Sequence, residues 1–172
     1  MDKDKYQHEK KASDKRSEFI KSMTILDYDE IEMDYFVVLF KPDAIRRQSV
    51  IHKCMKRFEE AGYLMDGVRW IPKASKKLIE YHYWHNLKKP FYPRLLKSMT
   101  CGPIMAIKYY GNITKAREMV GPISIEYGPD IHKTMRGRFS NGLPFNVIHC
   151  SVNKTQAKKD LQLWFDDEPI IE

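Results

Sequence analysis

The sequence predicts an α/β fold, because short apolar runs typical of strands alternate with amphipathic stretches typical of helices. From residue 35 onward the predicted order is β-α-β-α-α-β-α-β. Two split βαβ units of this kind form a ferredoxin-like α/β sandwich, in which a four-stranded antiparallel sheet carries helices on one face. A chain of 172 residues is long enough for one such domain and an additional arm.

The charge of the chain changes near residue 34. Residues 1–34 carry seven basic and ten acidic residues and lack a lasting apolar period, so we expect a charged arm that is partly disordered. Residues 35–172 form the predicted domain. They carry a net charge of +10, because the whole chain has a net charge of +7. Such a body favours an anionic partner, which leaves nucleotides, nucleic acid and a membrane surface open.

Composition and targeting signals predict a protein of the cytoplasm. No apolar run approaches the roughly 20 residues of a membrane-spanning helix, so we expect no membrane insertion. Three widely spaced cysteines, without a CxxC pair, argue against a disulfide framework or zinc ribbon and favour a reducing compartment. The N-terminal segment lacks the apolar centre of a secretory signal, and its acidic residues argue against a mitochondrial transit peptide.

The individual elements follow from local sequence signals. Residues 35–40 are an apolar run of β-formers that Pro42 stops, since proline cannot donate to a sheet ladder. A helix with apolar residues at helical spacing follows and ends at Gly62, a typical C-terminal cap. Gly67 predicts a bulge in the second strand, and Ser75 predicts the N-cap of a helix that runs to about Leu87.

The second half repeats this alternation around one long loop. Residues 121–145 contain four glycines and three prolines, and a loop of this length in a compact domain is usually functional or disordered. The remaining predicted elements are the second strand at 63–71, a short helix at 91–99, a strand at 103–110, a helix at 113–120, a strand at 146–151 and a closing helix at 153–164.

Charged, aromatic and proline-containing motifs follow one another along the domain. They are Lys41-Pro42-Asp43, His82-Tyr83, Lys89-Pro90-Phe91-Tyr92, Gly102-Pro103, Arg117, Thr134-Met135-Arg136-Gly137 and Asn146-Val147-Ile148-His149-Cys150-Ser151. In order and nearly in spacing, this array over residues 35–166 resembles the nucleoside diphosphate kinase family. No single motif would be specific, but the whole array is.

The resemblance implies a ping-pong phosphotransferase in which His149 accepts the phosphate. Taken alone, a histidine in an apolar strand is more often a satisfied core group. A neutral imidazole can, however, attack phosphorus when cations stabilise the migrating group. By resemblance, the substrate-binding residues are Lys41, Phe91, Arg117, Ile123, Arg136 and Asn146, and the supporting residues are Tyr83, Leu95, Leu143, Ser151 and Asp160.

The same resemblance implies how the nucleotide is held. Phe91 and Leu143 form an open slot that stacks the base and discriminates little between bases, while Lys41 and Asn146 bind the ribose hydroxyl. Ser151 and Asp160 fix the orientation of the imidazole. Mg²⁺ is the expected cofactor and binds through the phosphates and water, with no metal ligand from protein side chains. A homo-oligomer is expected.

Four features depart from the family pattern. Cys150 replaces a glycine, Val152 replaces an acidic residue, and Ile123 replaces a phosphate-binding threonine unless Ser124 substitutes for it. The loop before Arg136 is also about two residues longer than in the common form. These departures favour an alternative, a catalytically weak family member that binds nucleotides or nucleic acid. No arginine-rich helix or RNA-binding aromatic motif supports specific nucleic-acid recognition.

Overall fold

The computed structural model describes residues 33–123 and 130–166. The prediction of a charged arm falls almost wholly on residues 1–32, outside this part of the chain, and so does the alternative role of Ser124. Within the described ranges, no helix is long and apolar enough to cross a membrane.

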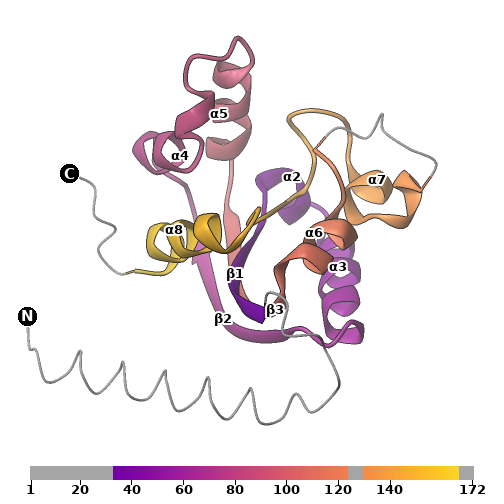
Figure 1. The fold of residues 1–172 in the computed structure, drawn as a ribbon. Coiled ribbons are helices and arrows are strands. Elements are labelled where there is room, and N and C mark those ends of the chain that lie inside the picture. Colours follow the sequence, from indigo (N-terminus) through magenta and orange to yellow (C-terminus); the bar gives the residue numbers. More distant parts are fainter. Residues whose placement is uncertain (1–32, 124–129, 167–172) are drawn as a thin grey trace, which may run out of the picture. The chain divides into compact units, whose positions relative to one another are not determined.

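A four-stranded antiparallel sheet forms the centre of the domain, with the strand order β2-β3-β1-β4 (Figure 1). The central strand β1 pairs with β3 along its whole length and with β4 over three residues next to the site, Val38 with Cys150, Leu39 with His149 and Phe40 with Ile148. A bulge between Met65 and Gly67 interrupts the pairing of β2 with β3, as the sequence predicts. The strands are β1 (Met33–Phe40), β2 (Leu64–Ile71), β3 (Ile104–Asn112) and β4 (Ile148–Cys150).

The helices lie on both faces of the sheet, which corrects the prediction of a single covered face. Phe36, Val38 and Phe40 pack on one side against helices α3 and α6, whereas Val37 and Leu39 pack on the other against α4, α5 and α8. All five of these β1 residues have no exposed surface. Apolar side chains that alternate to both faces of a strand require a cover on each side. The helices are α2 (Pro42–Ile45), α3 (Gln48–Glu60), α4 (Lys76–His82), α5 (Tyr92–Thr100), α6 (Ile113–Val120) and α8 (Lys154–Phe165).

Local capping signals place most helix ends where the sequence predicts them. Ser75 accepts a hydrogen bond from the backbone of Leu78, and Gly62 has a positive φ of 80° one residue after the cap of α3. The predicted helix from Ser75 to Leu87 is wrong in its length, because α4 ends at His82. Tyr83 leaves helical geometry there, and a 3₁₀ turn, Trp84–Asn86, follows.

The long loop also contains structure that the sequence analysis missed. A 3₁₀ turn, Ile131–Lys133, leads into the short helix α7 (Met135–Phe139). The side chain of Thr134 caps α7 by accepting a hydrogen bond from the backbone of Gly137 at 3.0 Å. This helix carries Arg136 into the interior, where the side chain is almost fully buried.

Candidate functional site

A cavity of about 600 Å³ brings together residues from four distant parts of the chain. Nine of the twelve residues that the sequence analysis singled out line it: Lys41, Tyr83, Phe91, Leu95, Ile123, Arg136, Leu143, Asn146 and His149. Four further lining residues were not predicted: His85, Asn86, Arg94 and Pro144. The remaining three predicted residues, Arg117, Ser151 and Asp160, lie outside the cavity lining.

Lys41 stands at the end of β1, immediately before α2, and its side chain is almost fully buried. The ammonium group donates to Asn146 Oδ1 at 2.7 Å and to the backbone oxygen of Pro144. Burial lowers the pKa of Lys41 to about 8, with Asp43 opposing and Arg136 adding to this shift. The side chain is therefore mostly protonated at neutral pH, and it is held next to the amide of Asn146.

Arg136 supplies a second cation at the same end of the cavity. Its guanidinium donates to the backbone oxygen of Ile148 at 2.8 and 3.0 Å and to that of Gly121 at 2.9 Å. Burial and the neighbouring Arg117 lower its pKa to about 10, so it stays charged at neutral pH. Arg117 itself donates to the backbone oxygen of Cys150 at 3.3 Å. Both arginines thus hold the strand that carries His149.

His149 lies on β4 with one ring nitrogen engaged. Its Nε2 lies 3.3 Å from Asp160 Oδ2, so Nδ1 is the nitrogen left for chemistry in the cavity. Burial and the nearby His82 lower the pKa of His149 to about 4, although Asp160 opposes this shift. The imidazole is therefore neutral at pH 7 and has a lone pair available, as a nucleophile requires.

Asp160 is fully buried behind this imidazole. Its carboxylate accepts from Ser151 Oγ at 2.7 Å and from Gln156 Nε2 at 2.9 Å. Burial opposes the charge, but interactions with His149 and His82 outweigh it and hold the pKa of Asp160 well below its usual range. The ionised carboxylate favours the tautomer in which His149 carries its proton on Nε2.

His82 is a further member of this cluster, which the sequence analysis named in the motif His82-Tyr83 but did not place among the site residues. Its Nδ1 lies 3.4 Å from Asp160 Oδ1 and accepts a hydrogen bond from Trp164 at 3.1 Å, and its ring meets that of His149 edge to face at 4.4 Å. Among the described residues, His82, His149 and Asp160 form the one group with metal-ligand atoms within 4.8 Å of one another. Because these atoms already face each other, we assign the cluster to orientation of the imidazole.

The backbone before His149 is held in an unusual conformation. Val147 has a positive φ of 56°, which a β-branched residue rarely adopts. Its N–H donates to Asp43 Oδ2 at 3.0 Å, and its carbonyl accepts from the backbone of Lys41 at 2.9 Å. Such strain persists only where surrounding contacts determine the geometry. Here the contacts from the end of β1 determine the path of the chain into His149.

The other end of the cavity is apolar and open. Phe91 and Leu143 line it with 54% and 52% of their surfaces exposed, and Leu95, one turn after Phe91 on α5, lies buried beneath. Large exposed apolar side chains beside a cavity are suited to the faces of a flat ring system. No carboxylate is among the described lining residues.

Three residues that depart from the family pattern, Ile123, Val152 and Cys150, differ in their position relative to the cavity. Ile123 lines the cavity with 58% of its surface exposed, whereas Val152 is exposed outside it. Cys150 is completely buried beside His149, and burial raises the pKa of its thiol to about 12.

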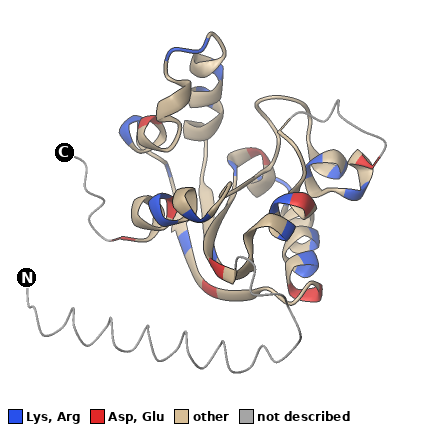
Figure 2. Ribbon diagram, viewed as in Figure 1, with Lys and Arg blue, Asp and Glu red and all other residues tan. Residues whose placement is uncertain are grey.

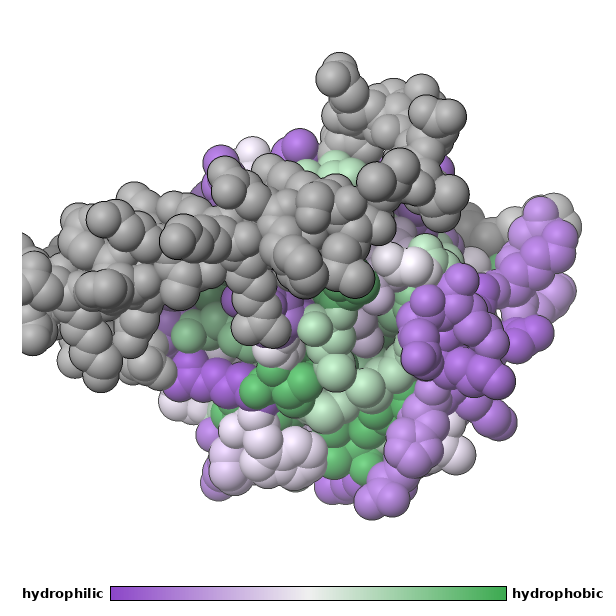
Figure 3. Space-filling model, turned by 90° about the horizontal axis from the view of Figure 1, so that it is seen from below, coloured by the Kyte–Doolittle hydropathy of each residue, from purple (hydrophilic) through white to green (hydrophobic). Residues whose placement is uncertain are grey.

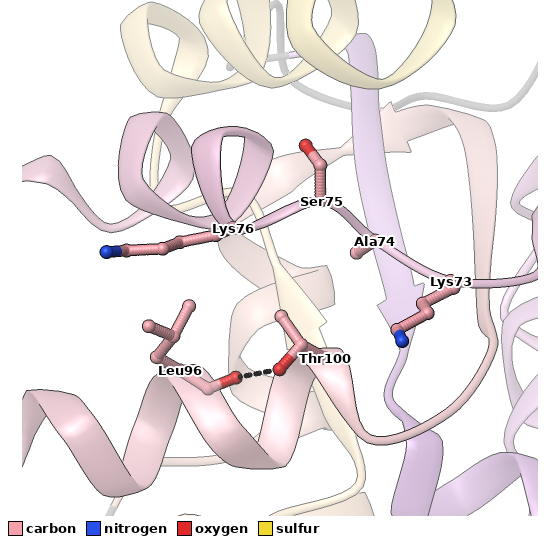
Figure 4. A pocket seen from close by; sticks show the side chains of 6 residues that line it. All are labelled: Lys73, Ala74, Ser75, Lys76, Leu96 and Thr100. Atoms are coloured by element: carbon pink, nitrogen blue, oxygen red, sulfur yellow. Dashed lines mark hydrogen bonds between the residues drawn. The ribbon is translucent and has the colours of Figure 1, made fainter.

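A second hollow lies between the start of α4 and helix α5 (Figure 4). Its hydroxyl groups are already bonded, Ser75 to the backbone of Leu78 and Thr100 to the carbonyl of Leu96 at 2.9 Å. Lys73 and Lys76 point in different directions in Figure 4. No buried charge or nucleophile lines it, so the candidate site is the cavity at His149.

Comparisons with known proteins find relatives over most of the chain. Residues 35–170 match the family described as nucleoside diphosphate kinase. A nucleoside diphosphate kinase of Ginglymostoma cirratum is 37% identical over 139 residues, covering 78% of this chain and 88% of that protein. The one of Thermosynechococcus vestitus is 32% identical over 144 residues, covering 81% and 91%.

Solved structures show the same fold. The nucleoside diphosphate kinase of Encephalitozoon cuniculi is 27% identical with a TM-score of 0.73, covering 80% of this chain and 92% of that one. The enzyme of Aquifex aeolicus is 22% identical with a TM-score of 0.71, covering 81% and 99%, which supports the fold alone.

Proposed function

Because the chain belongs to the nucleoside diphosphate kinase family, we propose that it moves the γ-phosphate of a nucleoside triphosphate to a nucleoside diphosphate through a phosphorylated His149. The observation that carries this proposal is the neutral imidazole of His149, fixed by Asp160 and lying in one cavity with Lys41 and Arg136. Phosphoryl transfer depends mostly on positioning and on cations around the migrating group, and this cavity offers both.

The proposed reaction consists of two half-reactions. In the first, the Nδ1 lone pair of His149 attacks the γ-phosphorus, the bond to the bridging oxygen breaks, and a nucleoside diphosphate leaves. In the second, a terminal oxygen of another diphosphate attacks the phosphorus, the N–P bond breaks, and neutral imidazole returns. Asp160 keeps the proton on Nε2 in both halves, so no proton has to leave Nδ1 before attack.

The phosphates and the ribose are bound by groups that are already in place. Lys41 and Arg136 neutralise the phosphates, and Arg117 stiffens the strand next to them. Asn146, bonded to Lys41, binds the ribose hydroxyl, and the nucleobase stacks between Phe91 and Leu143. Mg²⁺ bound to the phosphates would lower their charge, and the absence of carboxylates among the described lining residues fits a metal carried by the substrate.

We further propose a cytoplasmic homo-oligomer. Cys54, Cys101 and Cys150 are free thiols, as expected in a reducing compartment. The strand β2 lies at the edge of the sheet and exposes Leu64, Met65, Val68 and Trp70, an arrangement suited to pairing with a second copy. Viewed from below, hydrophobic residues gather in the middle of the visible face, with hydrophilic ones on both sides (Figure 3). Sedimentation would test the oligomer.

The alternative of nucleic-acid binding receives less support. Lysine and arginine are spread over α3, α7, α8 and the α4–α5 region rather than gathered on one element (Figure 2). A continuous basic surface is what binding to a phosphate backbone requires. Lys41 and Arg136 are almost fully buried, which suits a small phosphate ligand inside a cavity instead.

The proposed reaction is tested by labelling the enzyme itself. Incubation with Mg²⁺ and γ-labelled ATP should give a phosphoprotein that is labile in acid and stable in base, and a nucleoside diphosphate should discharge it. His149→Ala should abolish the label. His52→Ala, on the exposed side of α3, is the matched control and should label normally. Equal labelling of the two variants would reject His149 as the acceptor.

A further inference from the structure

The open end of the cavity holds a charged side chain that phosphoryl transfer does not use. Arg94 lines the cavity from α5, and its side chain is exposed. Among the described residues, no hydrogen bond or ion pair holds its guanidinium. This distinguishes Arg94 from Arg136, whose guanidinium is tied to two backbone carbonyls.

The position of Arg94 on α5 places it beside the base slot. Residues three and four apart lie on the same face of a helix, so Arg94 and Leu95 flank Phe91 one turn further along. Phe91, Arg94 and Leu95 all line the cavity. An aromatic ring and a guanidinium on one helical face offer a stacking surface together with hydrogen-bond donors at its rim.

Arginine can only donate hydrogen bonds, and this fixes what it can recognise. The keto oxygens of guanine, uracil and thymine accept a hydrogen bond, whereas the amino groups of adenine and cytosine at the same positions are donors. Guanine also presents its O6 and N7 side by side, which matches the planar fork of arginine. Stacking between Phe91 and Leu143 cannot make this distinction, since every base has a flat face.

We propose that Arg94 reads the edge of the nucleobase and makes the site prefer bases with a keto oxygen at C6 of a purine or C4 of a pyrimidine, guanine most of all. This inference rests on the proposed function, because it takes the ligand to be a nucleotide with its base between Phe91 and Leu143. All natural bases are still accepted, since stacking and phosphate binding are common to them. One hydrogen bond at an exposed site corresponds to about a three- to tenfold preference.

Equilibrium binding to the full chain tests this without requiring turnover. Calorimetry with Mg²⁺ and GDP, IDP, ADP, UDP or CDP should give GDP and IDP similar affinities, about three- to tenfold tighter than ADP, and UDP tighter than CDP. IDP retains O6 and N7 but lacks the amino group of guanine, so it isolates the keto edge. Arg94→Gln should remove these preferences and leave ADP affinity nearly unchanged, while Arg94→Lys should retain part of them.

Lys97→Gln is the matched control, because it removes one exposed positive charge from the same helix outside the cavity. It should leave every affinity unchanged. An equal weakening of all five diphosphates in Arg94→Gln would mean that Arg94 binds phosphate, and would overturn the inference. An unchanged ratio of GDP to ADP affinity would overturn it too. If the five diphosphates bind equally but His149 is still phosphorylated, only the inference about Arg94 is wrong. If no diphosphate binds, the proposed function is wrong as well.

Discussion

Replacement of Asp160 by asparagine tests the orientation of His149, the proposed nucleophile. In the wild type the Oδ2 atom faces both Ser151 Oγ, at 2.7 Å, and His149 Nε2, at 3.3 Å. Asparagine is nearly isosteric, but it offers one oxygen and one amide donor in place of two acceptors. If the amide faces His149, a donor meets a donor, and the imidazole proton is driven to Nδ1. The nitrogen that should attack phosphorus is then protonated.

The size of the effect follows from the contact that is lost. A hydrogen bond to a charged group contributes about 1.5–3 kcal/mol, which corresponds to roughly 10- to 150-fold in rate. The pH dependence of the phosphorylation rate gives a second test. Burial and His82 lower the pKa of His149, whereas Asp160 raises it. Removing the carboxylate charge should therefore lower this pKa further and move the acidic limb of the rate profile to lower pH.

Rapid-quench measurement of a single phosphorylation turnover by labelled ATP is the suitable assay, with thermal unfolding as the check on folding. Asp160→Glu keeps the charge and both acceptors, and it should retain most of the rate. Ser151→Ala removes a donor to the carboxylate and an acceptor for the backbone N–H of Val37, but it leaves the charge beside His149 in place, so its effect on the rate should be smaller than that of Asp160→Asn. A folded Asp160→Asn enzyme with a rate within about twofold of the wild type would refute the orienting role.

Other changes probe the rest of the site. Burial lowers the pKa of His149 to about 4 and that of Lys41 to about 8, so kcat/KM should stay flat between these values, and Lys41→Arg should abolish only the basic limb. The depressed pKa of His149 also predicts that the free energy of unfolding decreases as the pH falls from 6.5 towards 4, because the unfolded chain binds the proton first. Gly137→Ala should lower the melting temperature, because a Cβ there would overlap the carbonyl oxygen of Ile131. It should also lower the activity, because α7 carries Arg136. Gly67→Ala should change the melting temperature little, because its Cβ would make ordinary contacts of at least 3.5 Å. Ile123→Thr should raise kcat/KM several-fold in steady-state assays, because a hydroxyl would face the phosphates where an exposed isoleucine now lies.

Local signals account for the parts of the fold that the sequence predicts well. The cap at Ser75, the turn at Gly62 and the bulge at Gly67 each depend on the conformational preference of one residue. Helix α7 was missed because its five residues include Gly137 and show no apolar period. Its stability comes from contacts outside itself, above all the bonds of Arg136 to distant carbonyls.

In the site, too, local sequence motifs predict some residues, whereas others depend on contacts between distant parts of the chain. The positions of His149, Lys41 and Asn146 follow from motif order, and their convergence is visible in one cavity. The motif His82-Tyr83 could not reveal the role of His82 in the site, because its partner Trp164 is 82 residues away and a histidine on an apolar helix face resembles any core residue. Arg94 resembles an ordinary exposed arginine. The available signal was the spacing of three residues between Phe91 and Arg94. That spacing indicates a functional position only once Phe91 is known to line a cavity.

The buried thiol of Cys150, beside the proposed nucleophile, has a consequence for the chemical reactivity of the enzyme. Only the thiolate reacts readily with alkylating agents and peroxide, and a pKa of about 12 leaves Cys150 almost wholly in the thiol form at neutral pH. Cys54 has the same raised pKa and is also inaccessible, whereas Cys101 is exposed. A thiol reagent should therefore modify one cysteine quickly, at the end of α5, and leave phosphoryl transfer intact. A cysteine next to the proposed phosphate acceptor should therefore not make the enzyme sensitive to thiol reagents.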